Sequence, residues 1–521
     1  MNNRTGLALV VALFLLAAVM NYSIHYNYPL PLHSDEYDHL AVLHEMQQTG
    51  KHVWYDPYIV QKRPAQRNLE INYDIFLYVF GTLTGLQPEH LPLVLPALFS
   101  FMLSLSAFVL VFALTKRDLA AFFAGIFVFF LPSNIAFLGY WFLVPMAVGI
   151  AAVPILAHAF LKAFNSWSYT LTLYVLIISI TFTHVVYITS LLPAFLAFIL
   201  LSPAEFKNRK NLLKLALGTL LLLGLTVFFV KWNQANPLET ILVILNLLVW
   251  PYGNHTAEYP LASYLGPTLA FLALAGALYF LLPLLNRALG GLVNRLPLFH
   301  SARKTVHYSK FVPLFAVVLL AVRVYADYSG TCLLGPCRRT VPALVTGTLI
   351  LAAVGFYAFI GFLNKLLLGV SPKPYRVMRA AIFMLVLAFL FHQLLTHPFV
   401  FANDPVRGLY HNIETTELPA LSWIKEFTEP DTVVFALPWT AKAIYLLADR
   451  KVVDTGAARL GTSLATLKDL TNFFLMDCAA KEAVLAKWPN QMIYAGKGYV
   501  DCPNLDQVLN SGGNFAYVQN T

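Results

Sequence analysis

The sequence predicts a polytopic α-helical membrane protein that ends in a soluble α/β domain. Of its 521 residues, 58% are hydrophobic and 12% are charged, whereas about a quarter are charged in a typical soluble domain. Apolar stretches of about 20 residues, the length that crosses a bilayer as a helix, recur up to residue 397. From about residue 399 onward, helix-like and strand-like segments alternate instead.

About eleven segments are predicted to span the membrane, and residues 168–202 can also be interpreted as one long broken helix. The first segment is followed by polar residues rather than by a small-residue cleavage site, so we expect a retained span and not a signal peptide. The predicted spans are residues 5–22, 91–114, 119–138, 141–161, 168–183, 186–202, 211–231, 261–285, 311–326, 341–364 and 379–397.

The charge distribution predicts the orientation of these spans. The formal net charge is +9, and the loops on one side carry more than twice as many Lys and Arg residues as the loops on the other side. The positive-inside rule therefore places the N-terminus in the cytoplasm and, with an odd number of spans, the C-terminal domain outside. Loop charge explains the basic balance, so no nucleic-acid partner is expected.

The four cysteines all fall on the predicted outer side, which is an oxidising compartment. Their even number predicts two disulfides, Cys332–Cys337 and Cys478–Cys502. Four free thiols are the alternative. A zinc site at the first pair is disfavoured because no second Cys or His pair follows nearby in the sequence.

Residues 23–90 form a long outer loop that holds two short helical stretches, residues 36–49 and 73–87. The second stretch is apolar but too short to span comfortably, so we expect juxtamembrane helices that lie at the interface. The first stretch opens with three carboxylates in four residues, Asp35, Glu36 and Asp38. This density is unusual in a chain that otherwise avoids charge.

These acids have a structural and a catalytic interpretation. Ser34 or Asp35 can cap a helix that begins near Glu36, which would explain the acids by helix capping and dipole effects alone. A carboxylate at the outer membrane surface can also deprotonate an acceptor hydroxyl or bind a divalent metal beside a lipid phosphate. Asp35 and Asp38 share one helix face, whereas Glu36 points elsewhere.

The stretch "SDEYDHLAVLHEMQQTGK" resembles the Asp-Glu motif of the GT-C glycosyltransferases, such as protein O-mannosyltransferases and lipid A aminoarabinose transferases. The resemblance implies that Asp35 is the catalytic base or the acid that positions the acceptor, with Glu36 beside it. Further segments resemble oligosaccharyltransferase catalytic subunits in the same order up to about residue 455. These are "LTKRDLAAFFAGIFVFFLPSNIAF", "THVVYITSLLP", "HTAEYPLASYL" and "PDTVVFALPWTAKAIYLLADRKVVDTG".

Two departures from that pattern limit the resemblance. The second acidic motif is expected after the third span, where "FLGYWFLVPM" contains no carboxylate. We therefore expect either no cofactor or a divalent cation, Mg²⁺ or Mn²⁺, held at Asp35. The Trp-Trp-Asp-Tyr-Gly motif that reads an Asn-x-Ser/Thr acceptor is replaced by residues 438–442, in which Trp439 is a candidate substrate contact.

Other candidate site residues lie near the outer ends of spans and in outer loops. Arg323 sits inside an apolar span, where an ionisable residue is costly and usually functional, although pairing with Asp327 or snorkelling also explains it. His184 and Arg63 are further candidates for the donor phosphate. Tyr187 and Glu258 are candidates for sugar contact, the latter at the position of a functional Glu in the resembling family. Packing or solvation is the alternative for these residues.

We therefore expect an inverting GT-C-like glycosyltransferase, with a transmembrane domain at residues 1–398 and an extracytoplasmic α/β domain at residues 399–521. It would transfer a sugar from a polyprenyl-phosphate donor in the bilayer to a lipid, glycan or protein acceptor outside. The alternatives are oligosaccharyltransferase-like transfer to protein and a non-catalytic transporter or assembly protein. No nucleotide-binding P-loop, GxGxxG fingerprint or HExxH motif is present.

Overall fold

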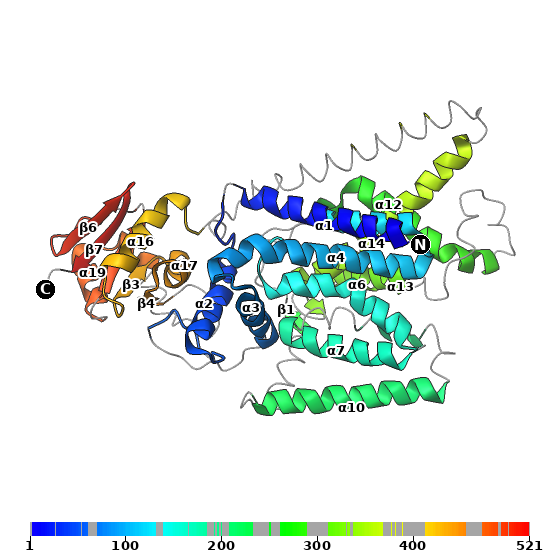
Figure 1. Cartoon of the computed structure of the whole chain (residues 1–521), viewed down its shortest axis with the longest axis horizontal. Coiled ribbons are helices and arrows are strands. Elements are labelled where there is room, and N and C mark those ends of the chain that lie inside the picture. The colour runs from blue at the N-terminus through cyan, green and yellow to red at the C-terminus, as the bar shows by residue number, and fades with distance from the viewer. Residues whose placement is uncertain are drawn as a thin grey trace. The chain divides into compact units, whose positions relative to one another are not determined.

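The structure is a computed structural model in which the chain divides into two compact units (Figure 1). The first unit consists of Met1–Asn21, Ala97–Trp141 and Pro145–Asp404, and the second of Tyr22–Pro96, Phe142–Val144 and Pro405–Thr521. The structure describes residues 3–26, 28–53, 55–60, 70–131, 139–164, 166–184, 192, 195–196, 199–200, 208–232, 249–251, 261–288, 311–329, 331–333, 337–367, 377, 381, 388, 412–454, 471–487, 491–496, 498 and 500–519.

Long apolar helices make up most of the first unit. They are α1 (Asn3–His25), α4 (Leu91–Thr115), α5 (Asp118–Phe127) continued by η2 (Val128–Phe130), α6 (Pro145–Ala163), α7 (Trp167–His184), α10 (Arg209–Trp232), α12 (Leu261–Ala288), α13 (Phe311–Ser329) and α14 (Cys337–Leu367). A short antiparallel pair, β1 (Val249–Pro251) with β2 (Thr331–Leu333), was not predicted.

The membrane class predicted from the sequence is confirmed by these helices. Among the described residues, four stretches are long and apolar enough to cross a membrane, namely Thr5–Ser23, Pro88–Thr115, Pro145–Ala163 and Val341–Leu363. Every predicted span that falls within the described ranges contains a helix. Residues 186–202 and 379–397 lie largely outside those ranges, so the number of spans stays a prediction.

Small and hydroxyl-bearing residues hold the helices of the first unit together. The backbones of α12 and α14 approach so closely that a Cβ atom at Gly276 would lie 1.9 Å from the Leu351 carbonyl oxygen. On α4, the Ser104 hydroxyl donates to the Gly125 carbonyl at 2.8 Å and the Ser106 hydroxyl to the Ala151 carbonyl at 2.9 Å. Such contacts replace the hydrophobic driving force that is weak between helices in lipid.

The second unit begins with two short helices in the predicted loop of residues 23–90. The predicted helices 36–49 and 73–87 are confirmed as α2 (Ser34–Thr49) and α3 (Ile71–Thr84), each ended by a glycine with positive φ. A short 3₁₀ turn, η1 (Pro88–His90), follows them. The buried His39 and Asp74 side chains join α2 to α3, with Nδ1 and Oδ1 at 3.0 Å.

The C-terminal part of this unit is the predicted α/β domain. Its sheet has the order β4-β3-β5-β7-β6, with β3 parallel to β4 and β5, and β7 antiparallel to β5 and β6. The strands are β3 (Val433–Ala436), β4 (Lys451–Val452), β5 (Gln491–Gly496), β6 (Leu505–Ser511) and β7 (Asn514–Gln519). The helical elements are η7 (Thr415–Glu417), α16 (Leu418–Phe427), α17 (Pro438–Ala448), η8 (Phe473–Leu475) and α19 (Cys478–Leu485).

Two details of this domain differ from the sequence prediction. The sequence pattern over residues 464–487 predicts a helix, but Met476 has an extended backbone between η8 and α19. Strand β6 was not predicted, although Gly512 and Gly513 form a two-residue turn with positive φ at both positions. Such a Gly-Gly pair between alternating segments is a hairpin signal.

The segment Tyr22–Pro96 and the C-terminal segment build this unit together. Ile59 forms a parallel bridge with Val452, and the Val452 N–H donates to the Tyr58 carbonyl at 2.8 Å. The Tyr28 hydroxyl donates to the Ile413 carbonyl at 2.6 Å. The sequence analysis assigned these two segments to different domains, residues 1–398 and 399–521. The boundary between those domains lies outside the described residues.

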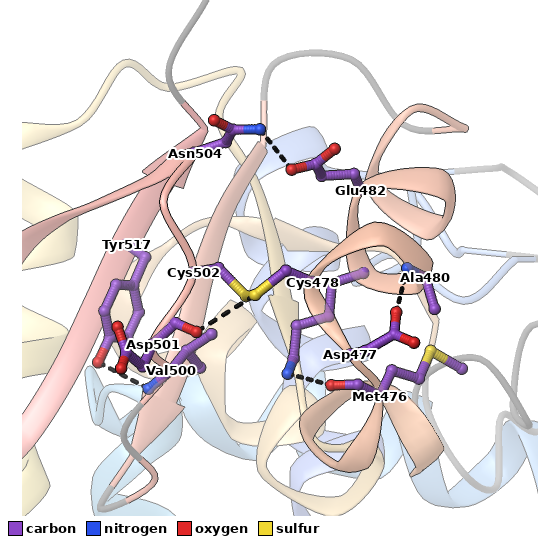
Figure 2. Close-up of a disulfide and its surroundings, with 11 residues drawn as sticks. Met476, Asp477, Cys478, Ala480, Glu482, Val500, Asp501, Cys502, Asn504 and Tyr517 are labelled. Carbon is purple, nitrogen blue, oxygen red and sulfur yellow. Dashed lines mark hydrogen bonds between the residues drawn. A yellow bond between two sulfur atoms is a disulfide. The ribbon is translucent and has the colours of Figure 1, made fainter.

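A disulfide between Cys478 and Cys502 ties α19 to the segment before β6, as predicted (Figure 2). The two cysteines are 24 residues apart, and closing a loop of that length restricts the unfolded chain. Next to it, the Asp477 carboxylate caps α19 by accepting from the Ala480 N–H at 2.8 Å. The side chains of the other predicted pair, Cys332 and Cys337, lie outside the described residues.

We expect Gly355→Ala in α14 to destabilise the chain, because a Cβ atom there would lie 1.9 Å from the backbone oxygen of Leu272. Overpacking of this kind costs about 1–3 kcal/mol. Gly361→Ala on the same helix is the matched control, since a Cβ atom there meets nothing within 4 Å. Thermal unfolding in detergent should show a lower midpoint for the first variant alone, and equal midpoints would contradict the close helix contact.

Candidate active site

The site begins at the N-terminal end of α2, where His33 is the capping residue. Its Nδ1 atom accepts a hydrogen bond from the Asp35 N–H at 3.1 Å, and the Glu36 carboxylate accepts one from the His33 N–H at 2.7 Å. The expectation that Ser34 or Asp35 caps the helix is therefore wrong. His33 was missed because Ser, Thr, Asp and Asn are the usual capping residues, and an imidazole rarely replaces them.

Glu36 is fully buried and bound by backbone groups. Besides the His33 N–H, its carboxylate accepts a hydrogen bond from the Leu143 N–H at 2.6 Å. Leu143 lies in "FLGYWFLVPM", the stretch in which the second acidic motif was expected and is absent. Burial raises the pKa of Glu36 to about 7, although the hydrogen bonds from the two N–H groups oppose that shift. Glu36 thus anchors this segment on the start of α2.

Asp35 and Asp38 face the opposite way and share one cation, the ammonium group of Lys442. Helix α17, which carries Lys442, packs against α2 (Figure 1). Lys442 Nζ donates to Asp38 Oδ2 at 2.7 Å and lies 3.6 Å from Asp35 Oδ1. The Lys442 side chain is fully buried and that of Asp38 is 5% exposed, whereas that of Asp35 is 40% exposed. Asp35 is therefore the carboxylate of this cluster that solvent or a substrate can reach.

Further polar contacts continue along the same pair of helices. The Tyr445 hydroxyl donates to Glu45 Oε2, and the Tyr55 hydroxyl donates to Glu45 Oε1 at 2.7 Å. One turn on, His44 Nε2 lies 3.4 Å from Asp449 Oδ1. Burial and the nearby Glu45 carboxylate raise the pKa of Tyr445, so its hydroxyl stays protonated as the donor. These contacts fix the register of α17 on α2, and so the position of Lys442.

The described residues do not fit the metal site that was predicted at Asp35. Among them, no group of three or more His, Cys, Asp and Glu side chains is placed to hold a metal ion. Asp35 and Asp38 converge on one point, and that point is taken by the Lys442 ammonium group. A divalent cation that used both carboxylates would meet a buried like charge, which is strongly unfavourable.

The remaining candidate residues fall into three groups. Trp439 lies on α17 with its ring centroid 5.8 Å from Lys442 Nζ, and 38% of this residue is exposed, so it borders the cluster. Arg323 on α13 is 8% exposed and His184 ends α7, and both belong to the first unit. Arg63, Tyr187 and Glu258 lie outside the described residues.

Sequence reasoning did not identify Lys442 as a site residue. The signal was a lysine on an otherwise largely apolar helix face, because Tyr445 and Leu446, three and four residues on, are both buried. A buried ammonium group requires a carboxylate partner. That partner is 404 positions away in the chain, however, so no local pattern could point to it.

Comparison with known proteins relates the chain to others by its fold. No protein-family profile matches it, and no curated protein matches it in sequence. The apo structure of the Archaeoglobus fulgidus oligosaccharyltransferase superimposes with a TM-score of 0.60, at 14% identity over 94% of this chain and 69% of that one. ArnT from Cupriavidus metallidurans, bound to undecaprenyl phosphate, superimposes with a TM-score of 0.56, at 12% identity over 98% of this chain and 97% of that one.

A third structure shows the same likeness. The A. fulgidus oligosaccharyltransferase AglB in complex with an inhibitory peptide and a dolichol-phosphate gives a TM-score of 0.54, at 12% identity over 94% of this chain and 69% of that one. The resemblance to the GT-C glycosyltransferases that the motifs predicted is thus confirmed at the level of the fold.

The raised pKa of Glu36 predicts a pH-dependent contribution to stability. A carboxyl group whose pKa rises from 4.5 in the unfolded chain to about 7 in the folded protein stabilises the fold fully below pH 4.5. That contribution is lost as the pH rises through about 7. Glu36→Gln removes this titration. The thermal unfolding midpoint of the wild type minus that of the variant should therefore decrease as the pH is raised from 5 to 8. A difference between the two unfolding midpoints that does not change with pH would contradict the raised pKa of Glu36.

Proposed function

We propose that the chain is an inverting membrane glycosyltransferase that takes a sugar from a polyprenyl-phosphate donor and transfers it to an acceptor hydroxyl on the extracytoplasmic side. The observation that carries this proposal is the half-exposed Asp35 carboxylate, placed by the His33 cap and by the Lys442–Asp38 ion pair. The fold likeness supports the donor class, because two of the similar structures hold undecaprenyl phosphate and a dolichol-phosphate.

In the proposed reaction Asp35 acts as the general base. The acceptor oxygen attacks the anomeric carbon of the donor while its proton moves to the Asp35 carboxylate. The bond from the anomeric carbon to the phosphate oxygen breaks, and its electron pair leaves with the polyprenyl phosphate. Attack from the side opposite the leaving group inverts the anomeric centre. Glu36 and Asp38 position Asp35, the first through the backbone and the second through Lys442.

The leaving phosphate needs a positive partner, because its charge develops in a site with little water. Arg323 is our first candidate, since it is a buried cation on the apolar helix α13. We assign supporting roles at the phosphate to His184 and Arg63. Trp439, Tyr187 and Glu258 are proposed for contact with the sugar or the acceptor. The N-terminus is proposed to lie in the cytoplasm, in line with the loop charges.

Transfer to Asn-x-Ser/Thr peptides is less well supported as the activity. A peptide with an NVT sequon is tethered in another structure of the A. fulgidus enzyme, whose fold this chain shares. In this chain, residues 438–442 replace the sequon-reading motif, and Lys442 within them is buried against Asp38. We therefore propose that this segment binds α2 and does not recognise the sequence of an acceptor.

We expect Asp35→Asn to reduce sugar transfer by about 10²–10⁴-fold, the usual contribution of a general base. Asp431→Asn, an exposed position of the same unit, is the matched control and should leave transfer unchanged. The measurement is release of polyprenyl phosphate by the full chain in lipid, with a panel of polyprenyl-phosphate sugars. Unaltered turnover in Asp35→Asn would refute the catalytic assignment, and no release from any donor by the wild type would favour a non-catalytic protein.

A further inference from the structure

We propose that the Lys442 ammonium group takes the place of a divalent cation between Asp35 and Asp38, so that this chain positions its carboxylates without a metal. Lys442 is then a positioning residue supplied by the C-terminal domain to the first outer loop. The inference rests on the proposed function only where activity is concerned. As a statement about cation binding it is independent of that function.

The geometry of the cluster is the first argument. Two carboxylates three residues apart on a helix present their oxygens on one side, and Lys442 Nζ lies at 2.7 Å from one and 3.6 Å from the other. A single positive centre shared by two carboxylates is how a metal ion is commonly held. Here the centre is an ammonium group, which donates directly to Asp38 Oδ2.

Burial is the second argument, because it keeps the Lys442 ammonium group bound to its carboxylate partners. The Lys442 side chain is fully buried, and Tyr445 and Leu446 on the same face of α17 are buried as well. An ammonium group in such surroundings loses its hydration and cannot leave its carboxylate partners without a large penalty. A metal ion therefore cannot displace Lys442, and it cannot bind beside it without like-charge repulsion.

Removing this one charge should create a metal site. In Lys442→Met the volume of the side chain is retained, but Asp35 and Asp38 keep their converging oxygens and their mutual repulsion. Carboxylate oxygens are preferred ligands of Mg²⁺ and Mn²⁺. We expect wild type to bind no Mn²⁺ at this cluster and Lys442→Met to bind one ion. The further change Asp35→Asn in that variant should weaken the gained binding at least tenfold.

The first experiment measures Mn²⁺ binding by the purified full chain in detergent, by calorimetry and by the shift of the unfolding midpoint. Lys425→Met, an exposed lysine in the same unit, is the matched control and should behave as wild type. One Mn²⁺ bound by wild type and lost in Asp35→Asn would overturn the proposal, even if Lys442→Met does not fold. A folded Lys442→Met that binds no Mn²⁺ would overturn it as well.

The second experiment measures release of polyprenyl phosphate with and without EDTA. We expect wild-type release to be unchanged by EDTA, and Lys442→Met to be impaired and restored at least tenfold by Mn²⁺. Loss of wild-type release in EDTA, with recovery in Mn²⁺, would overturn the inference. If wild type releases nothing from any donor, the proposed function fails while the binding experiment still decides the inference.

Discussion

The ion pair between Asp38 and Lys442 is the interaction on which the organisation of the second unit depends. Both side chains are buried, and removing one partner of a buried pair costs about 3–5 kcal/mol because the other charge stays uncompensated. This pair therefore ties the segment Tyr22–Pro96 to the C-terminal domain. The bridge between Ile59 and Val452 and the contact of Tyr28 with the Ile413 carbonyl follow from the same association.

Because α2 is packed in this way, its three neighbouring acids lie in three different environments. Glu36 is buried on the N–H groups of His33 and Leu143, so it fixes the start of α2 and the segment around Leu143. Asp38 binds the ammonium group of Lys442 and sets its position. Asp35 shares that ammonium group at 3.6 Å but is 40% exposed, which the general base that we propose would need in order to meet an acceptor. The environment of each acid, rather than its residue type, decides its chemistry.

Local patterns predicted much of this from the sequence. The length of the apolar stretches predicted the long helices, and the succession of helix-like and strand-like segments predicted the α/β domain. Helical spacing separated Glu36 from Asp35 and Asp38. The patterns failed where a distant contact decides the outcome. Lys442 finds its partner through the packing of α17 on α2, and no periodicity encodes that packing. His33 was missed as a cap for a different reason, because an imidazole is a rare substitute for a hydroxyl or carboxylate.

A double-mutant cycle on Asp38→Asn and Lys442→Met tests most directly whether this pair holds the two segments together. The free energy of unfolding would be measured for the wild type, both single variants and the double variant, by chemical denaturation in detergent. Each single variant should lose about 3–5 kcal/mol of unfolding free energy, and the sum of these two losses should be well above the loss measured for the double variant. Losses that add to within about 0.5 kcal/mol would show that the two side chains do not interact, and would contradict the account.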